Sequence, residues 1–204
     1  MQPPAQTLAN RAFPTPVPAQ ESGVVEGGIP DDWLAAQAAE GSLQAMETLV
    51  IRHQPRILRF LLSKTNSRTE AEDLAQETFL TACRKIRGYN PKYPFTTWLY
   101  TIAQRLAISS WRKQRETTDQ ISELTDSAAC PAQNAQNQEK SANLWIQARN
   151  ILNHNQYSAL WLHYAEDLPV ADIAKALSKT VPGVKLLLFR ARNKLQSTLS
   201  PELL

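Results

Sequence analysis

The chain has 204 residues, of which 43% are hydrophobic, and a formal net charge of +3 at pH 7. This composition can bury cores of ordinary size, and we expect two small domains rather than one large one. The positive charge is concentrated, because residues 98–115 and 173–201 carry Lys and Arg without any acid. Residues 116–141 between them carry five acids and one Lys. Two separate basic segments predict contact with a polyanion.

Cysteine content indicates a reducing compartment, and hydropathy indicates neither a signal peptide nor a membrane span. Cys83 and Cys130 are too few and too unlike in setting for a disulfide framework, and they suggest no metal site. No charged segment followed by an apolar run marks a signal peptide, and no apolar run approaches the ~18 residues of a membrane span. We therefore expect a cytoplasmic protein without membrane insertion.

The first part of the chain is predicted to change from disorder to helix. Residues 1–30 hold six of the 13 prolines, and such a composition buries too little apolar area to offset the ordering entropy. We expect a disordered Pro-rich arm. A short helix is then expected from Asp31 or Asp32 to about Glu40. Pro55 interrupts the following apolar stripe and predicts either a kinked continuation or a new helix over 57–62.

A better-defined helix follows. Apolar residues recur at helical spacing over 71–86 and predict a core face, with Gly88 as the stop. The opposite face carries a row of two acids, one amide and one apolar residue, namely Asp73, Gln76, Glu77 and Leu80. A solvated polar face is one interpretation, but an apolar residue rimmed by acids is typical of a docking surface.

A loop stiffened by two prolines comes next, over residues 87–95. Its aromatic side chains alternate with cations, which suits stacking on unpaired bases and neutralising phosphates. An aromatic lid over the core is the alternative. The candidate nucleic-acid contacts in this loop are Tyr89, Lys92, Tyr93 and Phe95.

The next helix is expected to begin at Thr96 or Thr97 and to run to Arg115. Side chains off its core stripe include several cations and no acid. Because like charges along one helix repel, a polyanion is their natural counter-charge. The candidate contacts on this helix are Trp98, Thr101, Arg105, Arg112 and Lys113.

Two runs in this region, EAEDLAQETFL at 70–80 and PFTTWLYTIA at 94–103, resemble region two of the extracytoplasmic-function sigma factors of bacterial RNA polymerase. The resemblance implies that the acidic row docks on the clamp helices of the polymerase's largest subunit. It also implies that the loop and the basic helix melt and read the minus-ten promoter element. Family members usually have Asn where this chain has Arg105 and often Asp where it has Ser109. Arg105 can still contact a guanine edge, with a changed sequence preference.

Residues 116–142 are rich in Gln, Asn, Ser and Ala, and we expect a flexible linker. Helical patterning resumes at residue 143, with a second helix capped near Asn153 or Asn155. The tail then has the pattern of a helix-turn-helix, in which Pro169 opens a short helix and residues 178–181 form the turn.

The final helix has an apolar stripe and a basic remainder. Thr180 can cap it, and a helix of this kind enters the major groove by its N-terminal end. Basic amphipathic helices also bind membranes and partner proteins. The candidate contacts on this helix are Thr180, Lys185, Leu186, Phe189, Arg190 and Arg192.

The segment 152–192 is similar to region four of the same sigma family, which reads the minus-thirty-five element. Ser178 replaces the usual turn glycine, and Leu186 stands where Ser is frequent. The resemblance implies an all-α fold of two small helical domains, region 2 over 31–115 and region 4 over 143–204. Its implied partners are core RNA polymerase, promoter DNA and an anti-sigma factor.

An enzyme is the main alternative from another class. His53, His154 and His163 lack the spacing of a zinc site, and the acids over 70–77 have no second cluster that would complete a Mg²⁺ site. We therefore expect no catalysis, no metal and no cofactor. A helix-turn-helix regulator acting on duplex DNA without polymerase and a metal-dependent nuclease remain as alternatives.

Overall fold

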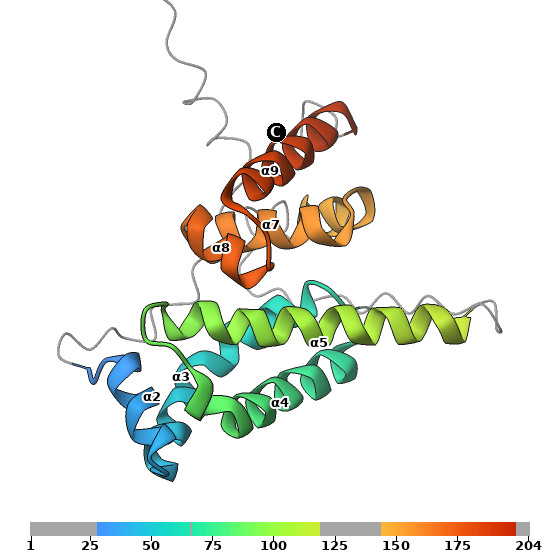
Figure 1. The fold of residues 1–204 in the computed structure, drawn as a ribbon. Coiled ribbons are helices and arrows are strands. Elements are labelled where there is room, and N and C mark those ends of the chain that lie inside the picture. Colours follow the sequence, from blue (N-terminus) through green and yellow to red (C-terminus); the bar gives the residue numbers. More distant parts are fainter. Residues whose placement is uncertain (1–27, 66, 119–143, 199–204) are drawn as a thin grey trace, which may run out of the picture. The chain divides into compact units, whose positions relative to one another are not determined.

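The computed structural model describes residues 28–65, 67–118 and 144–198, and over these ranges it contains helices, turns and loops but no strand (Figure 1). The chain divides into two compact units. The first is built from the helices between Asp31 and Thr118, and the second from those after residue 143. The all-α fold with two small helical domains is therefore confirmed. The expected linker lies outside the described residues from residue 119 onward, whereas its first three residues, 116–118, belong to a helix. Nearly all of the Pro-rich arm also lies outside the described residues.

Among its described residues, the first unit contains four α-helices and one 3-10 turn. Their bounds are α2 Asp31–Ala39, α3 Leu43–Leu62, α4 Arg68–Lys85, η1 Ile86–Gly88 and α5 Phe95–Thr118. The hydroxyl oxygens of Ser42 and Ser67 cap α3 and α4, because they accept the N–H groups of Ala45 and Glu70. Helix α2 is closed at its C-terminal end by Gly41, whose φ of 107° suits a residue without a side chain.

The structure decides one open alternative in this unit and corrects one expected helix boundary. Pro55 lies inside α3, which continues to Leu62 as one helix, so the residues over 57–62 continue α3 and do not form a new helix. Buried side chains beyond the proline, such as Phe60, hold the second half of α3 on the core. Helix α5 begins at Phe95 rather than at Thr96 or Thr97. The fixed φ of Pro94 suits the position before the first turn, and its carbonyl accepts the N–H of Trp98.

The core of the first unit joins α3 to α5. Phe60 and Tyr100 are fully buried and meet edge to face, with ring centroids 5.1 Å apart. Next to them, the Lys64 ammonium donates to Gln104 over 2.6 Å and lies 4.7 Å from the centre of the Phe60 ring. Ser110 donates to Glu70 over 2.7 Å and so ties α5 to α4.

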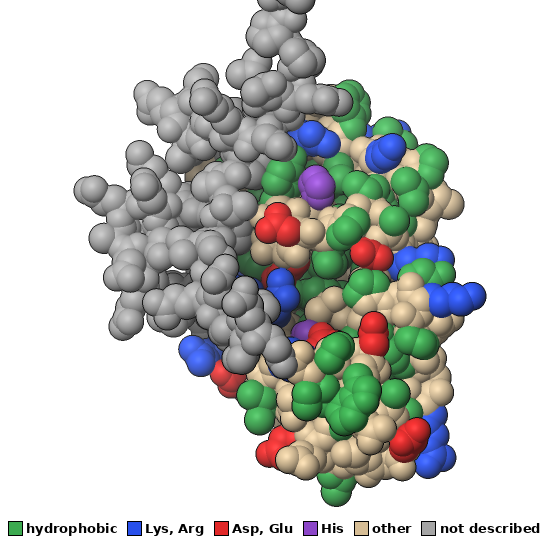
Figure 2. Space-filling view, turned by 90° about the vertical axis from the view of Figure 1, so that its left-hand side faces the viewer, with side chains coloured by type: hydrophobic (Ala, Val, Ile, Leu, Met, Phe, Trp, Pro, Cys, Tyr) green, Lys and Arg blue, Asp and Glu red, His purple; other side chains and the backbone are tan. Residues whose placement is uncertain are grey.

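Helix α2 covers this core with one side only. Leu34 and Ala35 are buried, whereas Trp33 is 52% exposed. Ile29 and Leu43, which flank the helix, are also exposed. Figure 2 shows hydrophobic side chains gathered among acidic ones at this end of the first unit. Besides these buried side chains, α2 is fixed by a few polar contacts made from its first turn, described below.

The second unit contains a helix over residues 144–151, α7 His154–Tyr164, α8 Val170–Ala176 and α9 Val181–Thr198. Asn153 caps α7 as predicted and forms a capping box with Gln156. Trp145, Tyr157 and Trp161 cluster in the core, with the two Trp ring centroids 4.8 Å apart.

The turn between α8 and α9 has the expected helix-turn-helix pattern. Ser178 has a φ of 52°, the left-handed conformation that glycine adopts without strain. Thr180 caps α9 as predicted, because its hydroxyl oxygen accepts the N–H of Gly183 over 3.2 Å. Val184, Leu188 and Leu195 on α9 are buried, so its other faces are free to carry the basic residues.

Candidate protein and nucleic-acid interfaces

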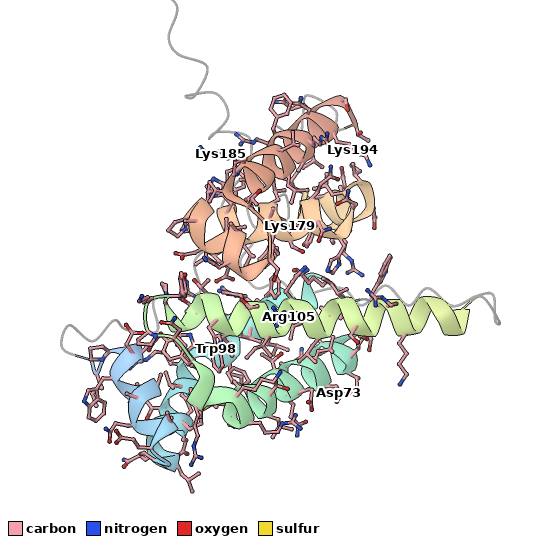
Figure 3. All side chains as sticks on the ribbon, viewed as in Figure 1. Asp73, Trp98, Arg105, Lys179, Lys185 and Lys194 are labelled. Carbon is pink, nitrogen blue, oxygen red and sulfur yellow. The ribbon has the colours of Figure 1, made fainter. Side chains whose placement is uncertain are left out.

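The acidic row of α4 lies on the face opposite its buried side chains. Asp73, Gln76 and Leu80 are exposed, and Glu77 is half-buried. Their spacing of three, four and seven residues puts them on one side of the helix. Leu80 is 49% exposed, which is unusual for a large apolar residue, and Asp73 lies toward the N-terminal end of α4 (Figure 3). The structure brings all four predicted docking residues together, in a surface that we call the α4 face.

The acids of the α4 face differ in their own contacts. Glu77 accepts a salt bridge from Arg84 at 2.5 Å and a hydrogen bond from Thr81 at 3.2 Å. Arg84 also donates to the carbonyl oxygen of Leu80. The sequence reasoning missed Arg84, although its spacing of seven from Glu77 places both on one side of α4. Asp73 carries no such bridge and is the more accessible of the two charges.

The loop before α5 carries a packed aromatic cluster formed by Tyr89, Phe95 and Trp98. Each pair of rings has centroids 5.5 to 5.6 Å apart. Phe95 is only 1% exposed, so its prediction as a nucleic-acid contact is wrong. As the first residue of α5 it points into the core, where it supports the other two rings. Tyr89 and Trp98 are half-buried and keep part of their rings at the surface.

Polar contacts hold this loop. The Tyr89 hydroxyl lies within hydrogen-bonding distance of the Asp32 carboxylate, at 2.5 Å, and of the carbonyl oxygen of Tyr93, at 2.8 Å. Burial, together with the bond to Asp32, raises the pKa of the Tyr89 phenol, which therefore stays a proton donor. Lys92 is exposed, and its N–H donates to the side chain of Asn90. The sequence reasoning missed the role of Asp32 here.

The polar side of α5 continues from this cluster. Arg105, Arg112 and Lys113 are exposed, and Trp98 and Arg105 are both shown on α5 in Figure 3. Trp98 and Arg105 are seven residues apart and so share one side of the helix. Thr101 lies between them, half-buried, with its hydroxyl donating to the carbonyl oxygen of Thr97 over 2.9 Å. Thr101 therefore faces the same side but offers mainly its oxygen as an acceptor.

Helix α9 presents most of its predicted contacts to solvent. Thr180, Lys185, Leu186, Phe189 and Arg190 are exposed, Leu186 at 46% and Phe189 at 58%. Lys185 near the start of α9 and Lys194 near its end are both cations of this helix (Figure 3). Arg192 is half-buried, and its Nε donates to the carbonyl oxygen of Leu188. The exposed side of α9 therefore carries cations next to two apolar residues, Leu186 and Phe189.

His53 has a structural explanation. It is 3% exposed, and its Nε2 lies 2.8 Å from the Asp31 carboxylate. Within the ranges that the structure describes, no three His, Cys, Asp or Glu side chains gather where they could hold a metal ion. The helices of these same ranges also include none with the length and apolar character needed to cross a membrane.

Comparison with known proteins identifies both units. Residues 49–117 match the family model of sigma-70 region 2, and residues 150–195 match that of sigma-70 region 4. The ECF RNA polymerase sigma factor SigM of Bacillus subtilis is 30% identical over 145 residues, which cover 69% of this chain and 86% of SigM. The chain belongs to the extracytoplasmic-function sigma factors.

Other relatives of this sigma factor support the same family assignment. The ECF RNA polymerase sigma factor BldN of Streptomyces coelicolor is 27% identical over 163 residues, 78% of this chain but only 61% of BldN. Among solved structures, the sigma factor RpoE of Bartonella quintana, in complex with the anti-sigma factor NepR, superposes with a TM-score of 0.65 at 26% identity. That match covers 76% of this chain and 96% of RpoE.

Proposed function

We propose that this sigma factor directs core RNA polymerase to promoters, opens the minus-ten element and starts transcription. The observation that carries the proposal is that one chain combines the α4 face and the aromatic cluster, inside the region 2 match, with a basic helix-turn-helix inside the region 4 match. The factor would act by binding and positioning DNA in the cytoplasm, while bond chemistry stays with the polymerase.

The α4 face is proposed as the surface that docks on polymerase. Asp73 and Gln76 offer a charge and an amide at the surface, and Leu80 offers an apolar contact in the same row. An exposed apolar residue surrounded by polar groups is the composition of a protein interface. Glu77 would contact polymerase either after giving up its salt bridge to Arg84 or while keeping it.

The aromatic cluster and α5 are proposed to capture the opened minus-ten strand. Tyr89 and Trp98 offer ring surface for stacking on an unpaired base, and base–aromatic stacking contributes about 1–3 kcal/mol per base. Lys92, Arg105 and Arg112 are exposed cations next to or along the same helix and would neutralise phosphates. Tyr93, Thr101 and Lys113 complete the proposed set.

Helix α9 is proposed to read the duplex minus-thirty-five element. Lys185 and Arg190 are exposed and suited to phosphates or guanine edges. Leu186 and Phe189, one turn apart and exposed, are suited to contact with a thymine methyl group. Thr180 and Arg192 would add contacts at the start and along the side of the helix.

An anti-sigma factor is a further proposed partner. The support is that the similar RpoE of Bartonella quintana was solved with an anti-sigma protein. A regulator that acts on duplex DNA without polymerase is not favoured, because the first unit matches sigma-70 region 2.

Reconstituted transcription tests the proposed function. The purified protein is added to core polymerase with fragments of its own genome, and start sites are mapped against core polymerase alone. We expect discrete starts that depend on the added protein. Failure to direct initiation from any genomic promoter would contradict the proposal, as would tight operator binding without any effect of polymerase.

A further inference from the structure

Helix α2 precedes the residues that match sigma-70 region 2, which begin at residue 49, and yet it reaches the aromatic cluster. Asp32, in the first turn of α2, accepts the hydroxyl of Tyr89, a residue 57 positions further along the chain. The bond therefore joins the start of the folded region to the loop that is proposed to capture an unpaired base.

Tyr89 is the centre of that loop. Its hydroxyl also lies 2.8 Å from the carbonyl oxygen of Tyr93, so its one proton has an acceptor on α2 and a second acceptor within the loop. Its ring packs against Phe95 and Trp98, with centroids 5.6 Å and 5.5 Å away. Whatever sets the direction of the Tyr89 ring therefore also limits where the Trp98 ring can lie.

The neighbouring Asp31 holds α2 in place from its other side. Its carboxylate accepts hydrogen bonds from Arg52 and from His53, both on α3. His53 is buried, and its ring lies 5.4 Å from that of Phe95, underneath the aromatic cluster. Two consecutive acids thus connect α2 to α3 and to the loop, so Asp32 cannot shift freely with the loop.

We propose that Asp32 is a positioning residue for promoter opening, which holds Tyr89, and through it Trp98, in the orientation that receives an unpaired base. The inference rests on the proposed minus-ten role of the cluster. A ring that is already ordered loses less conformational freedom when a base stacks on it, and this ordering raises the affinity for the opened strand. Asp32 itself touches neither DNA nor polymerase in this role.

The test uses holoenzyme assembled from the full chain and core polymerase, on a promoter from which the wild-type protein initiates. Open complexes are measured by permanganate reactivity of unpaired thymines, and core affinity is measured in parallel. Asp32→Ala and Tyr89→Phe should each lower the open-complex fraction about five- to tenfold, the size expected for one hydrogen bond of ordinary strength. Core affinity should stay unchanged.

The double variant Asp32→Ala/Tyr89→Phe should be no worse than Tyr89→Phe alone, because removing the hydroxyl already removes the bond to Asp32. Glu47→Gln, which neutralises an exposed carboxylate on α3, serves as the control and should open the promoter like the wild type. If Asp32→Ala does not fold, Tyr89→Phe decides, since it keeps the ring and its packing.

Unchanged opening in both single variants, or independent effects that multiply in the double variant, would overturn the positioning role. A parallel loss of core affinity would overturn it too, because α2 would then act on docking. A wild-type protein that never initiates would contradict the proposed function instead, so the two failures are distinguishable.

Discussion

Helices α5 and α9 are both basic helices proposed to contact promoter DNA, but the structure supports them differently. The start of α5 is surrounded by packed rings and by hydrogen bonds that reach from α2, with Phe95 buried underneath. Helix α9 has a buried stripe on one side and exposed side chains elsewhere, and Thr180 caps its start. A surface that binds unpaired bases needs aromatic rings held in one orientation. Duplex DNA can be bound by an exposed helix whose side chains are not held in one orientation.

The largest effect is expected for the surface that is proposed to bind protein rather than DNA. The Asp73→Lys/Glu77→Lys variant should lose about 100-fold in core affinity, because like charges placed together at an interface cost several kcal/mol. Asp73→Lys alone should account for more of the loss than Glu77→Lys, since Glu77 already has Arg84 as a partner. Fluorescence anisotropy with labelled core polymerase measures these losses of core affinity.

The matched control for this prediction is Glu72→Lys. Glu72 is the adjacent acid of α4, exposed and bridged to Arg68 over 2.7 Å. It has the same charge but lies off the α4 face. An equal loss of core affinity in Glu72→Lys would show that overall charge, and not the α4 face, determines docking.

The second prediction tests the aromatic cluster. Trp98→Ala should weaken binding of the holoenzyme to the single-stranded minus-ten strand about tenfold, the low end of base–aromatic stacking. Binding to duplex DNA that contains only the minus-thirty-five element should not change. Trp33→Ala, at a tryptophan exposed on α2, is the control and should match the wild type. An equal effect on both DNA forms would remove the distinction between α5 and α9.

The third prediction tests α9 through its salt dependence. Arg190→Ala should lower affinity for duplex minus-thirty-five DNA about fivefold and reduce the slope of log K against log salt by about one, as expected for one lost phosphate contact. Gln196→Ala, at an exposed uncharged position of the same helix, should leave the slope unchanged. Titrations at several salt concentrations provide the measurement. A slope equal to that of the wild type would place Arg190 away from phosphate.

The fourth prediction concerns the support of α2 and depends on pH. Burial raises the pKa of Asp31, but the hydrogen bond from His53 and the charge of Arg52 lower it overall below its ordinary value. A carboxylate of this kind stabilises the fold above the unfolded-state pKa of about 4, and the contribution is lost as pH falls through the lower folded-state value. Asp31→Asn should therefore destabilise the first unit by about 1 kcal/mol at pH 7, a typical value for such contacts.

Urea unfolding followed by tryptophan fluorescence measures this difference between Asp31→Asn and the wild type. The difference should shrink as pH is lowered below about 4, where the carboxyl of the wild type becomes protonated. A constant difference across this pH range would mean that the charge of Asp31 is not the source of its effect.

The smallest effect is expected in the turn before α9. Ser178→Gly should stabilise the second unit by about 0.5–1 kcal/mol, because glycine adopts the left-handed φ of 52° without strain. Asn193→Gly, at an exposed position inside α9, should have the opposite sign because glycine weakens a helix interior. Thermal unfolding of both variants checks the pair. Destabilisation by Ser178→Gly would mean that the serine side chain contributes more than its backbone strain costs.

Features that depend on neighbouring residues were predictable from the sequence. The cap at Asn153, the cap at Thr180 and the helix-turn-helix pattern all follow from residues within a few positions of each other. The acidic row of α4 was likewise predictable, because helical spacing alone places its members on one face.

Features that depend on packing were not predictable. Phe95 was assigned to the surface with the other aromatics of the loop, and only the position of α5 against α3 shows that it is buried. The local pattern at Pro55 left open whether α3 continues or a new helix begins, and the buried residues after it keep the helix continuous. In both cases contacts distant in sequence outweigh a local preference.

The sequence by itself determined that this protein is helical, that residues 98–115 and 173–201 carry cations without acids, and that it resembles a sigma factor, because these properties follow from local spacing and motif. Only the tertiary structure decided which rings of the loop face outward and that Asp32 holds one of them. A hydrogen bond across 57 residues exists only after the helices have packed, since no local preference brings its two partners together.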